Sequence, residues 1–466
     1  MSNKSAARPQ PQISVFDAVV ILVGMVVGIG IFRTPSIVAG SVSSEWMFVL
    51  AWVLGGGITL VGALCYAELS AAHPNAGGEY HFLSKAYGRG VAMMFGWARC
   101  TVVQTGAIAA VAFMLGDYLS QLFPLGPYGP ALYAATSVAV LTGINIVGTT
   151  ESKNLQIVVT LLEVGAIAGI VLFGFFGTGG MDVTPTMSPA TPPATAALGM
   201  AMIFVLLTYG GWNEAAYLTG ELIDAPRNIP KVLVLGTLIL VTLYVLTNLA
   251  LLSVLGLQGL RASNAVAADM MRVVAGPTGE IIVTLAIVVA AVSTLNATIF
   301  TGARVFYSMA NDMTIFQSVG VWDARGKTPT NGLLAQAAIA LALIGMGTLT
   351  RDGFKSMVDY TAPVFWFFLL LIGVSVFVLR RRFPARVLPY RVPLYPLTPI
   401  IFCLTCLYML YSSIVYTGVA GLMGLAVLIA GLPLLWFRKT SADDDTDVSC
   451  RPQRQAHTLG HEPPKP

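Results

Sequence analysis

Long apolar segments separated by short polar ones run along almost the whole chain of 466 residues. Each apolar segment is long enough for a membrane-spanning helix, which needs about 20 residues. None alternates apolar and polar positions over about ten residues, as membrane β-strands do. We therefore predict an all-α polytopic membrane protein with about twelve transmembrane helices. The expected spans are 15–40, 46–71, 91–120, 129–148, 154–178, 196–222, 230–256, 279–311, 331–349, 357–380, 394–416 and 418–437.

The composition supports this class, because 56% of the residues are hydrophobic and only 10% are charged. Soluble domains carry about 25% charged residues. The polar leader continues directly into a segment long enough to span, so we expect no cleaved targeting peptide. We expect residues 1–14 to be an N-terminal tail and residues 438–466, which are polar and rich in Pro, to be a disordered one.

The basic residues are distributed unequally between the two sides of the predicted membrane. Nineteen of the 26 Lys and Arg lie on the side of the termini, and only Arg261, Arg272, Arg351 and Lys355 lie in loops on the other side. Basic residues concentrate on the cytoplasmic side of membrane proteins. An even number of spans places both ends on one side, so the sequence predicts that both termini are cytoplasmic.

Glycines interrupt two of the predicted spans. The first span contains "GMVVGIGIF", with Gly24, Gly28 and Gly30, and the sixth contains Gly210 and Gly211 in "TYGGWNE". Discontinuous helices at corresponding places in two halves of a membrane protein indicate a mid-membrane site for a small molecule. The alternative is close helix packing, since Gly24 and Gly28 have the spacing of a small-residue interface.

Four motifs, in the expected order, resemble one known family. Gly28 to Phe32 ("GIGIF") is similar to the signature of the amino acid–polyamine–organocation superfamily. The segment from Tyr209 to Pro230, with "YGGWN" and "PRNIP", resembles its L-type amino-acid transporter branch. "HPNAGGEYHFLSKAYG" resembles the loop after the second span of that family, and "LNATIFTGARVFYSMAND" its eighth span. The resemblance covers roughly residues 14–437.

The resemblance implies a five-plus-five inverted repeat that moves amino acids by alternating access. The first repeat would cover residues 15–178, the second 196–380, and two extra helices 394–437. Backbone N–H groups at the first break would bind the substrate carboxylate, and carbonyl groups beside both breaks would bind its ammonium. Half-helix ends carry partial charges of the matching sign. The residues implied are Val26, Gly28, Ile29, Gly30, Ile31, Leu207 and Gly210.

Side-chain selectivity would have to come from other residues. Asn213 follows the sixth-span break, and the resemblance aligns it with an asparagine of the L-type transporters. A buried guanidinium without an acidic partner is costly, so an uncharged residue there favours neutral amino acids. Further polar or aromatic groups at similar depth either contact substrate or bridge helices. They are Gln104, Thr105, Asn296, Thr298, Phe365 and Trp366.

Two positions depart from the family pattern. The gating aromatic of the sixth span aligns with Leu207, so closure would depend on Leu207 itself or on Phe204, Tyr209 or Trp212. Animal L-type light chains carry a cysteine after the third span for a partner subunit, whereas "SQLFPLGPYGP" has none. We therefore expect no disulfide-linked heavy subunit.

A third departure concerns ion coupling. Many prokaryotic relatives place a lysine on the fifth span, where this chain has Glu163. An ionisable residue in the middle of a membrane is a functional candidate by default. Glu163 could exchange a proton, hold a cation together with Ser293 and Thr294 of the eighth span, or remain a neutral, packed acid.

These expectations favour a secondary active transporter of neutral L-amino acids in the inner membrane of a prokaryote, working as an exchanger. Proton- or cation-coupled symport is the alternative, and a non-transporting amino-acid sensor on the same fold is a third possibility. A membrane enzyme is disfavoured because the four histidines lie in one loop and the C-terminal tail. The chain shows no channel filter or metal-ligand pattern. We expect membrane lipid around the protein, no cofactor, no metal and no nucleic-acid partner.

Overall fold

The computed structural model describes residues 13–28, 30–75, 77–147, 153–177, 198–312, 329–350 and 352–437. The predictions for residues 1–12, for Ile29 and for the tail 438–466 lie outside these ranges. The described residues form helices and no β-sheet; one isolated bridge joins Ile13 to Leu222. Residues 13 and 14, expected in the N-terminal tail, therefore belong to the folded part.

Helices account for almost all of the described chain. They are α1 (Val15–Val26), α2 (Gly30–Ser41), α3 (Glu45–Ala72), α4 (Gly78–Tyr87), α5 (Arg89–Ala98), η1 (Arg99–Val103), α6 (Gln104–Leu122), α7 (Gly129–Val147), α8 (Lys153–Phe176), α9 (Leu198–Thr208), η2 (Trp212–Gly220), α10 (Ala225–Ala262), α11 (Val266–Asp312), α12 (Thr330–Gly347), α13 (Gly353–Arg382), α14 (Leu397–Tyr416), α15 (Gly418–Ala430) and η3 (Leu432–Phe437).

Each of the twelve predicted spans contains helix. In the described part of the chain, nine helices are long and apolar enough to cross a membrane, and α1 and α2 together form one more span with a 48° bend. The two remaining predicted spans correspond to α8 and to α9 followed by η2. The fold is that of an all-α, multi-pass membrane protein.

The structure corrects several details of the prediction. The loop after the second span contains a further helix, α4, and the third span includes a π-helical turn, η1. α10 continues beyond the predicted end of the seventh span, across a kink at Gly256, and α11 begins before the predicted start of the eighth span, with a kink at Gly276. The φ angles of these glycines, 61° and 69°, are readily adopted only by glycine. The apolar pattern therefore located the spans, while these glycines separate them from the short helical segments 257–262 and 266–275.

Side chains that cap helix N-termini explain where three helices begin. The Ser14 hydroxyl accepts from the Asp17 N–H, and the Asp17 carboxylate accepts from the Ser14 N–H, which makes a capping box for α1. The Ser44 side chain accepts from the first turn of α3, and the Asp352 side chain accepts from that of α13. Each cap satisfies backbone donors that have no acceptor within the helix.

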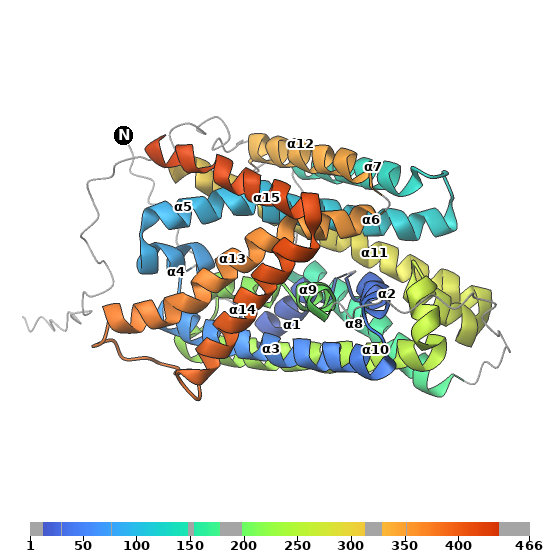
Figure 1. The fold of residues 1–466 in the computed structure, drawn as a ribbon, viewed down its shortest axis with the longest axis horizontal. Coiled ribbons are helices and arrows are strands. Elements are labelled where there is room, and N and C mark those ends of the chain that lie inside the picture. Colours follow the sequence, from blue (N-terminus) through green and yellow to red (C-terminus); the bar gives the residue numbers. More distant parts are fainter. Residues whose placement is uncertain are drawn as a thin grey trace, which may run out of the picture.

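The broken helices lie at the centre of the bundle. Figure 1 shows α1, α2, α8 and α9 between a layer that contains α3 and α10 and a layer that contains α5, α6 and α12. Large side chains that are fully buried surround them, including Trp52, Tyr66, Tyr209 and Tyr244. The outward faces of α7, α8, α14 and α15 instead expose apolar side chains, such as Phe176 and Leu404. Such faces suit contact with lipid tails.

Candidate functional site

The first span is interrupted within the glycine motif. α1 ends at Val26, Val27 leaves the helical conformation with ψ 76°, and α2 begins at Gly30. The Gly28 N–H donates to the Val26 carbonyl at 2.7 Å. The first N–H groups of α2 have no acceptor within their own helix, so this break presents backbone donors at a helix N-terminus.

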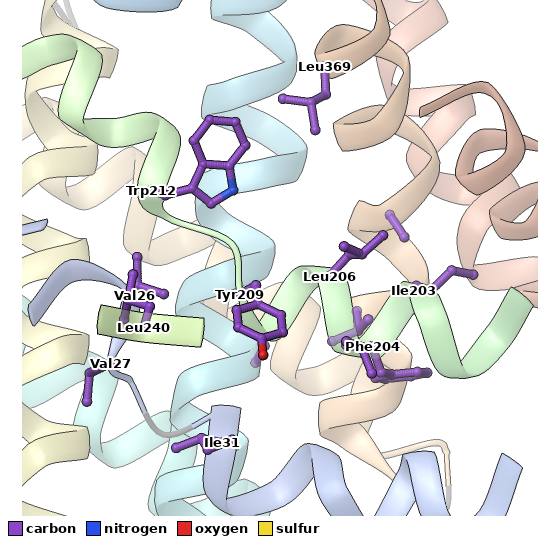
Figure 2. Close-up of a cluster of buried hydrophobic side chains, with 14 of the residues drawn as sticks. Val26, Val27, Ile31, Ile203, Phe204, Leu206, Tyr209, Trp212, Leu240 and Leu369 are labelled. Atoms are coloured by element: carbon purple, nitrogen blue, oxygen red, sulfur yellow. The ribbon is translucent and has the colours of Figure 1, made fainter. Parts of the chain in front are cut away.

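The sixth span is interrupted directly beside it. Tyr209, Gly210 and Gly211 separate α9 from η2, and Figure 2 shows Tyr209 and Trp212 at the two ends of this link. Gly211 has φ 103°, and a Cβ atom there would lie 3.1 Å from the Met25 carbonyl oxygen. Only glycine combines this conformation with so close an approach. The two breaks therefore touch each other.

The two broken spans run in opposite directions. The start of α1 meets the end of η2, because Ile13 N–H donates to the Glu221 carbonyl at 3.0 Å. The start of α2 meets the end of α9, where the Thr208 hydroxyl donates to that of Thr34 at 2.7 Å. α1 therefore pairs with η2 and α2 with α9, which is the arrangement expected of corresponding helices in inverted repeats.

The carbonyl groups predicted to bind an ammonium already have donors. The Val26 carbonyl accepts from the Tyr244 hydroxyl at 2.8 Å as well as from Gly28. The Leu207 carbonyl accepts from the Gly210 N–H at 3.0 Å. Since a carbonyl oxygen has two lone pairs, Val26 is fully engaged in this conformation, whereas Leu207 keeps accepting capacity.

The gate candidates are placed differently from one another. Tyr209 is fully buried, and its hydroxyl donates to the Trp52 carbonyl at 3.2 Å. Trp212 packs edge-on against Tyr66, with ring centroids 4.8 Å apart. Phe204 is also buried, and the centroids of its ring and that of Phe354 are 6.5 Å apart. Leu207 is only half-buried, beside the break. The three aromatic candidates thus pack against neighbouring helices.

Asn213 does not stand alone beside the break; it belongs to a buried polar network. Its amide donates to Glu79 Oε1 at 2.8 Å, and the Tyr66 hydroxyl donates to the same oxygen at 2.6 Å. Arg99 donates to Glu79 Oε2 at 3.1 Å and to both oxygens of Glu214, at 2.5 and 2.7 Å. This inner network joins α3, α4, η1 and η2 next to the break in the sixth span.

A second charged network lies on the other side of the breaks. Arg33 of α2 is 7% exposed and donates to Asp352 at 2.9 Å and to the Asn264 side chain at 3.0 Å. Its Nε lies 3.9 Å from Asp117 Oδ2 of α6. A cavity of about 350 Å³ adjoins this outer network and is lined by all four residues. Contacts between charged side chains thus join the helices on both sides of the breaks.

Sequence reasoning missed Glu79, Arg99 and Arg33 as site residues. A signal was present, because Arg33 and Arg99 lie within predicted spans, and intramembrane charges are functional candidates. Among the other polar candidates, two bridge helices. Gln104 donates to the Thr298 carbonyl at 2.9 Å, and Asn296 accepts from Asn145 at 2.7 Å.

The coupling candidate lies close to the first break. Glu163 of α8 is 6% exposed, and its Oε2 has no hydrogen-bond donor among the described residues. One turn earlier, Thr160 packs so tightly against Gly24 that any side chain at position 24 would collide with it. Gly24 is therefore a packing glycine. Thr294 faces Gly28 with its methyl group. No described contact joins Glu163 to Ser293 or Thr294.

The comparisons with known proteins identify the family. A model of the family described as "Amino acid permease" matches residues 13–431. The chain belongs to the amino acid permease family. Its relatives include the serine/threonine exchanger SteT of Bacillus subtilis, which is 26% identical over 432 residues. That alignment covers 92% of this chain and 97% of the relative.

Two mouse proteins are similarly related. The b(0,+)-type amino acid transporter 1 is 27% identical, over 87% of this chain and 83% of the relative. The large neutral amino acids transporter small subunit 2 is also 27% identical, over 91% of this chain and 80% of the relative. The resemblance seen in the motifs thus extends over nearly the whole chain. The names of these relatives describe transporters and exchangers rather than enzymes.

Proposed function

We propose that this protein is a secondary active transporter that exchanges neutral L-amino acids across the cytoplasmic membrane of a prokaryote. The observation that carries the proposal is the contact between the two breaks, where Gly211 lies against the Met25 carbonyl. A contact between two half-helix ends brings backbone donors and acceptors within reach of one zwitterion. One relative, SteT, is named as an exchanger, which supports the choice of exchange.

The α-carboxylate would bind the first N–H groups of α2, those of Gly30 and Ile31, together with the N–H of Ile29, which lies outside the described residues. The α-ammonium would bind the free lone pair of the Leu207 carbonyl and that of Val26 after the Tyr244 hydroxyl moves away. This assignment uses backbone groups only, and they recognise the part common to all amino acids. A substrate at the break would therefore compete with the hydrogen bond that Tyr244 of α10 makes to the first span.

Preference for neutral side chains would follow from the uncharged amide of Asn213, directly after the break in the sixth span. The two carboxylates of its network, Glu79 and Glu214, both bind Arg99. A cationic side chain that contacts Asn213 would gain no opposite charge from it, and burying a cation without an acidic partner is costly. We place both termini in the cytoplasm, because most of the basic residues lie on their side.

The domain organisation is part of the same proposal. Two repeats, 15–178 and 196–380, would be related by inversion, with residues 394–437 as additional helices. The antiparallel pairing of α1 with η2 and of α2 with α9 supports this division. We also expect no disulfide-linked subunit. Among the described cysteines, Cys65, Cys100 and Cys406 are buried and Cys403 is half-buried, and none lies between the third and fourth spans.

The test is uptake of radiolabelled amino acids into proteoliposomes that contain the purified protein. An exchanger takes up label many-fold faster when the vesicles contain unlabelled substrate, and uptake needs no pH or sodium gradient. Uptake that requires a gradient and ignores internal substrate would instead indicate symport. Binding without flux would indicate a sensor.

Proton- or cation-coupled symport has one observation in its favour, namely the buried Glu163 with an unpartnered oxygen. A carboxyl group in that position either carries a proton or needs a cation nearby. Because it lies on α8, which packs on α1 at Gly24, its charge state could influence the conformation of the first span.

A further inference from the structure

A second cavity lies apart from the helix breaks, at the end of the bundle where α3 ends and α13 gives way to a loop. Its volume is about 210 Å³. The loop, residues 383–396, forms one wall and the last turns of α3 and α13 form the others. The charged or titratable residues that line it are Glu68, His73, Arg380, Arg386 and Arg391.

One acid and one base in this cavity neutralise each other. Arg380 donates through Nε and a terminal nitrogen to the two oxygens of Glu68, at 2.6 and 2.5 Å. The N–H of Val392 donates to the same carboxylate at 2.7 Å, which ties the loop to α3. Glu68 therefore has little capacity left to balance another positive charge.

Arg386 and Arg391 remain uncompensated at the rim. A terminal nitrogen of Arg386 lies 3.2 Å from Nδ1 of His73. Burial, together with the Arg386 charge, lowers the pKa of His73 to about 4, so at neutral pH the imidazole is uncharged and accepts from Arg386. Arg391 is exposed and makes no ion pair or hydrogen bond with any described residue. Two positive charges thus face a small cavity whose described lining includes no free acid.

Apolar side chains project from the same loop. Val387 is 84% exposed, Leu394 is 77% exposed, and Leu397 at the start of α14 is 53% exposed. Large apolar groups beside arginines are typical of a segment at the boundary between lipid headgroups and acyl chains. Basic pockets at this depth bind anionic headgroups, and arginine forms paired hydrogen bonds with phosphate oxygens.

We propose that this cavity binds the phosphate of an anionic phospholipid, with Arg386 and Arg391 as its ligands and Val387 and Leu394 lying in the membrane interface. His73 positions Arg386, and the pair of Glu68 and Arg380 fixes the loop against α3. The competing explanation is that these arginines only contribute to the positive charge of one membrane face. That explanation predicts that replacing any arginine at this end of the bundle would weaken the binding of anionic lipid to the same extent.

The test measures lipid binding to the purified full-length protein in detergent by native mass spectrometry. The probes are phosphatidylglycerol and phosphatidylcholine with identical acyl chains. Arg391→Gln should weaken phosphatidylglycerol binding about fivefold, the usual effect of one basic residue at a lipid surface. The double variant Arg386→Gln/Arg391→Gln should lose the preference over phosphatidylcholine.

Arg381→Gln is the matched control, because Arg381 is an exposed arginine at the end of α13 that does not line the cavity. It should keep the preference for phosphatidylglycerol. Equal losses in Arg381→Gln and Arg391→Gln, or no loss in any variant, would overturn the proposal. Arg391 makes no ion pair or hydrogen bond with the described residues. Arg391→Gln should therefore leave the fold unchanged, and weaker lipid binding by this variant would report the loss of the ligand.

A second arm separates lipid from a soluble source of the same chemistry. Inorganic phosphate at millimolar concentration should leave the phosphatidylglycerol adduct unchanged, because the lipid also gains apolar contacts. Displacement of the lipid by inorganic phosphate, with the same dependence on Arg391, would refute the lipid as the ligand. Neither arm depends on transport, so both remain informative if the proposed function is wrong.

Discussion

The Tyr244 hydroxyl donates to the Val26 carbonyl at 2.8 Å, at the residue where α1 stops being helical. The same oxygen accepts from the Gly28 N–H. The hydroxyl therefore occupies a position that the proposed function gives to the substrate ammonium. Through this hydrogen bond, Tyr244 of α10 contacts the break in the first span, although α10 is not part of that span.

Tyr244→Phe should strengthen substrate binding. The variant removes the competing donor and leaves one lone pair of Val26 free, so we expect the dissociation constant to fall by about fivefold, the equivalent of one ordinary hydrogen bond of about 1 kcal/mol. Thermal shift of the purified protein against an amino-acid series measures this. Unchanged or weaker binding would mean that Val26 does not receive the ammonium.

Gly211→Ala should abolish transport. A non-glycine residue at φ 103° is strained, and its Cβ would lie 3.1 Å from the Met25 carbonyl, so the two breaks would have to separate. Gly57→Ala is the matched control, since Gly57 is an exposed glycine within α3 and a Cβ there meets no atom within 4 Å. We expect Gly57→Ala to transport normally, and normal uptake by Gly211→Ala would contradict the role given to this contact.

Arg99→Met should destabilise the protein strongly. It leaves the buried Glu79 and the part-exposed Glu214 without their cation, and breaking a buried ion pair such as that of Arg99 and Glu79 costs about 3–5 kcal/mol. Arg272→Met removes the exposed pair with Glu280, and such a pair contributes less than about 1 kcal/mol. Denaturant unfolding in mixed micelles compares the two. Similar losses in both variants would show that the inner network is not important for stability.

Much of the fold could be predicted, because the length of an apolar segment is enough to identify a membrane span. Two features could not be predicted in this way. α4 was missed because its sequence, from Gly78 to Tyr87, is too polar to attract attention in a search for spans. The bend at Gly256 was missed because hydropathy does not report the sign of φ.

The two breaks were predicted from their glycines, and the resemblance implied one site between them. The particular contact of Gly211 with the Met25 carbonyl was not predicted, because it depends on how helices five spans apart pack. The same limit applies to Asn213. Its position after the break was clear from the sequence, whereas its partner, Glu79, comes from a separate loop helix. Arg99 connects residues far apart in the sequence for the same reason.

Glu163→Gln separates the coupling mechanisms. The amide mimics a protonated acid, so under proton coupling the variant should lose the dependence of uptake on external pH that the wild type shows. Under cation coupling it should lose stimulation by sodium, and under exchange without coupling it should change neither. The measurement is initial uptake from pH 5 to 8, with and without sodium. A wild-type rate and profile would identify Glu163 as a packed, neutral acid.

Backbone groups at the two touching helix breaks are proposed to recognise both charged ends of an amino acid. A competition assay tests this recognition with the wild-type protein. It measures how far unlabelled compounds inhibit exchange of the best substrate, supplied in labelled form. The competitors are the α-carboxyl methyl ester and the N-acetyl derivative of that substrate. We expect neither derivative to inhibit exchange at concentrations where the unlabelled parent abolishes it, because each lacks one charged end. Inhibition by either derivative at the parent's concentration would show that the breaks do not bind both ends.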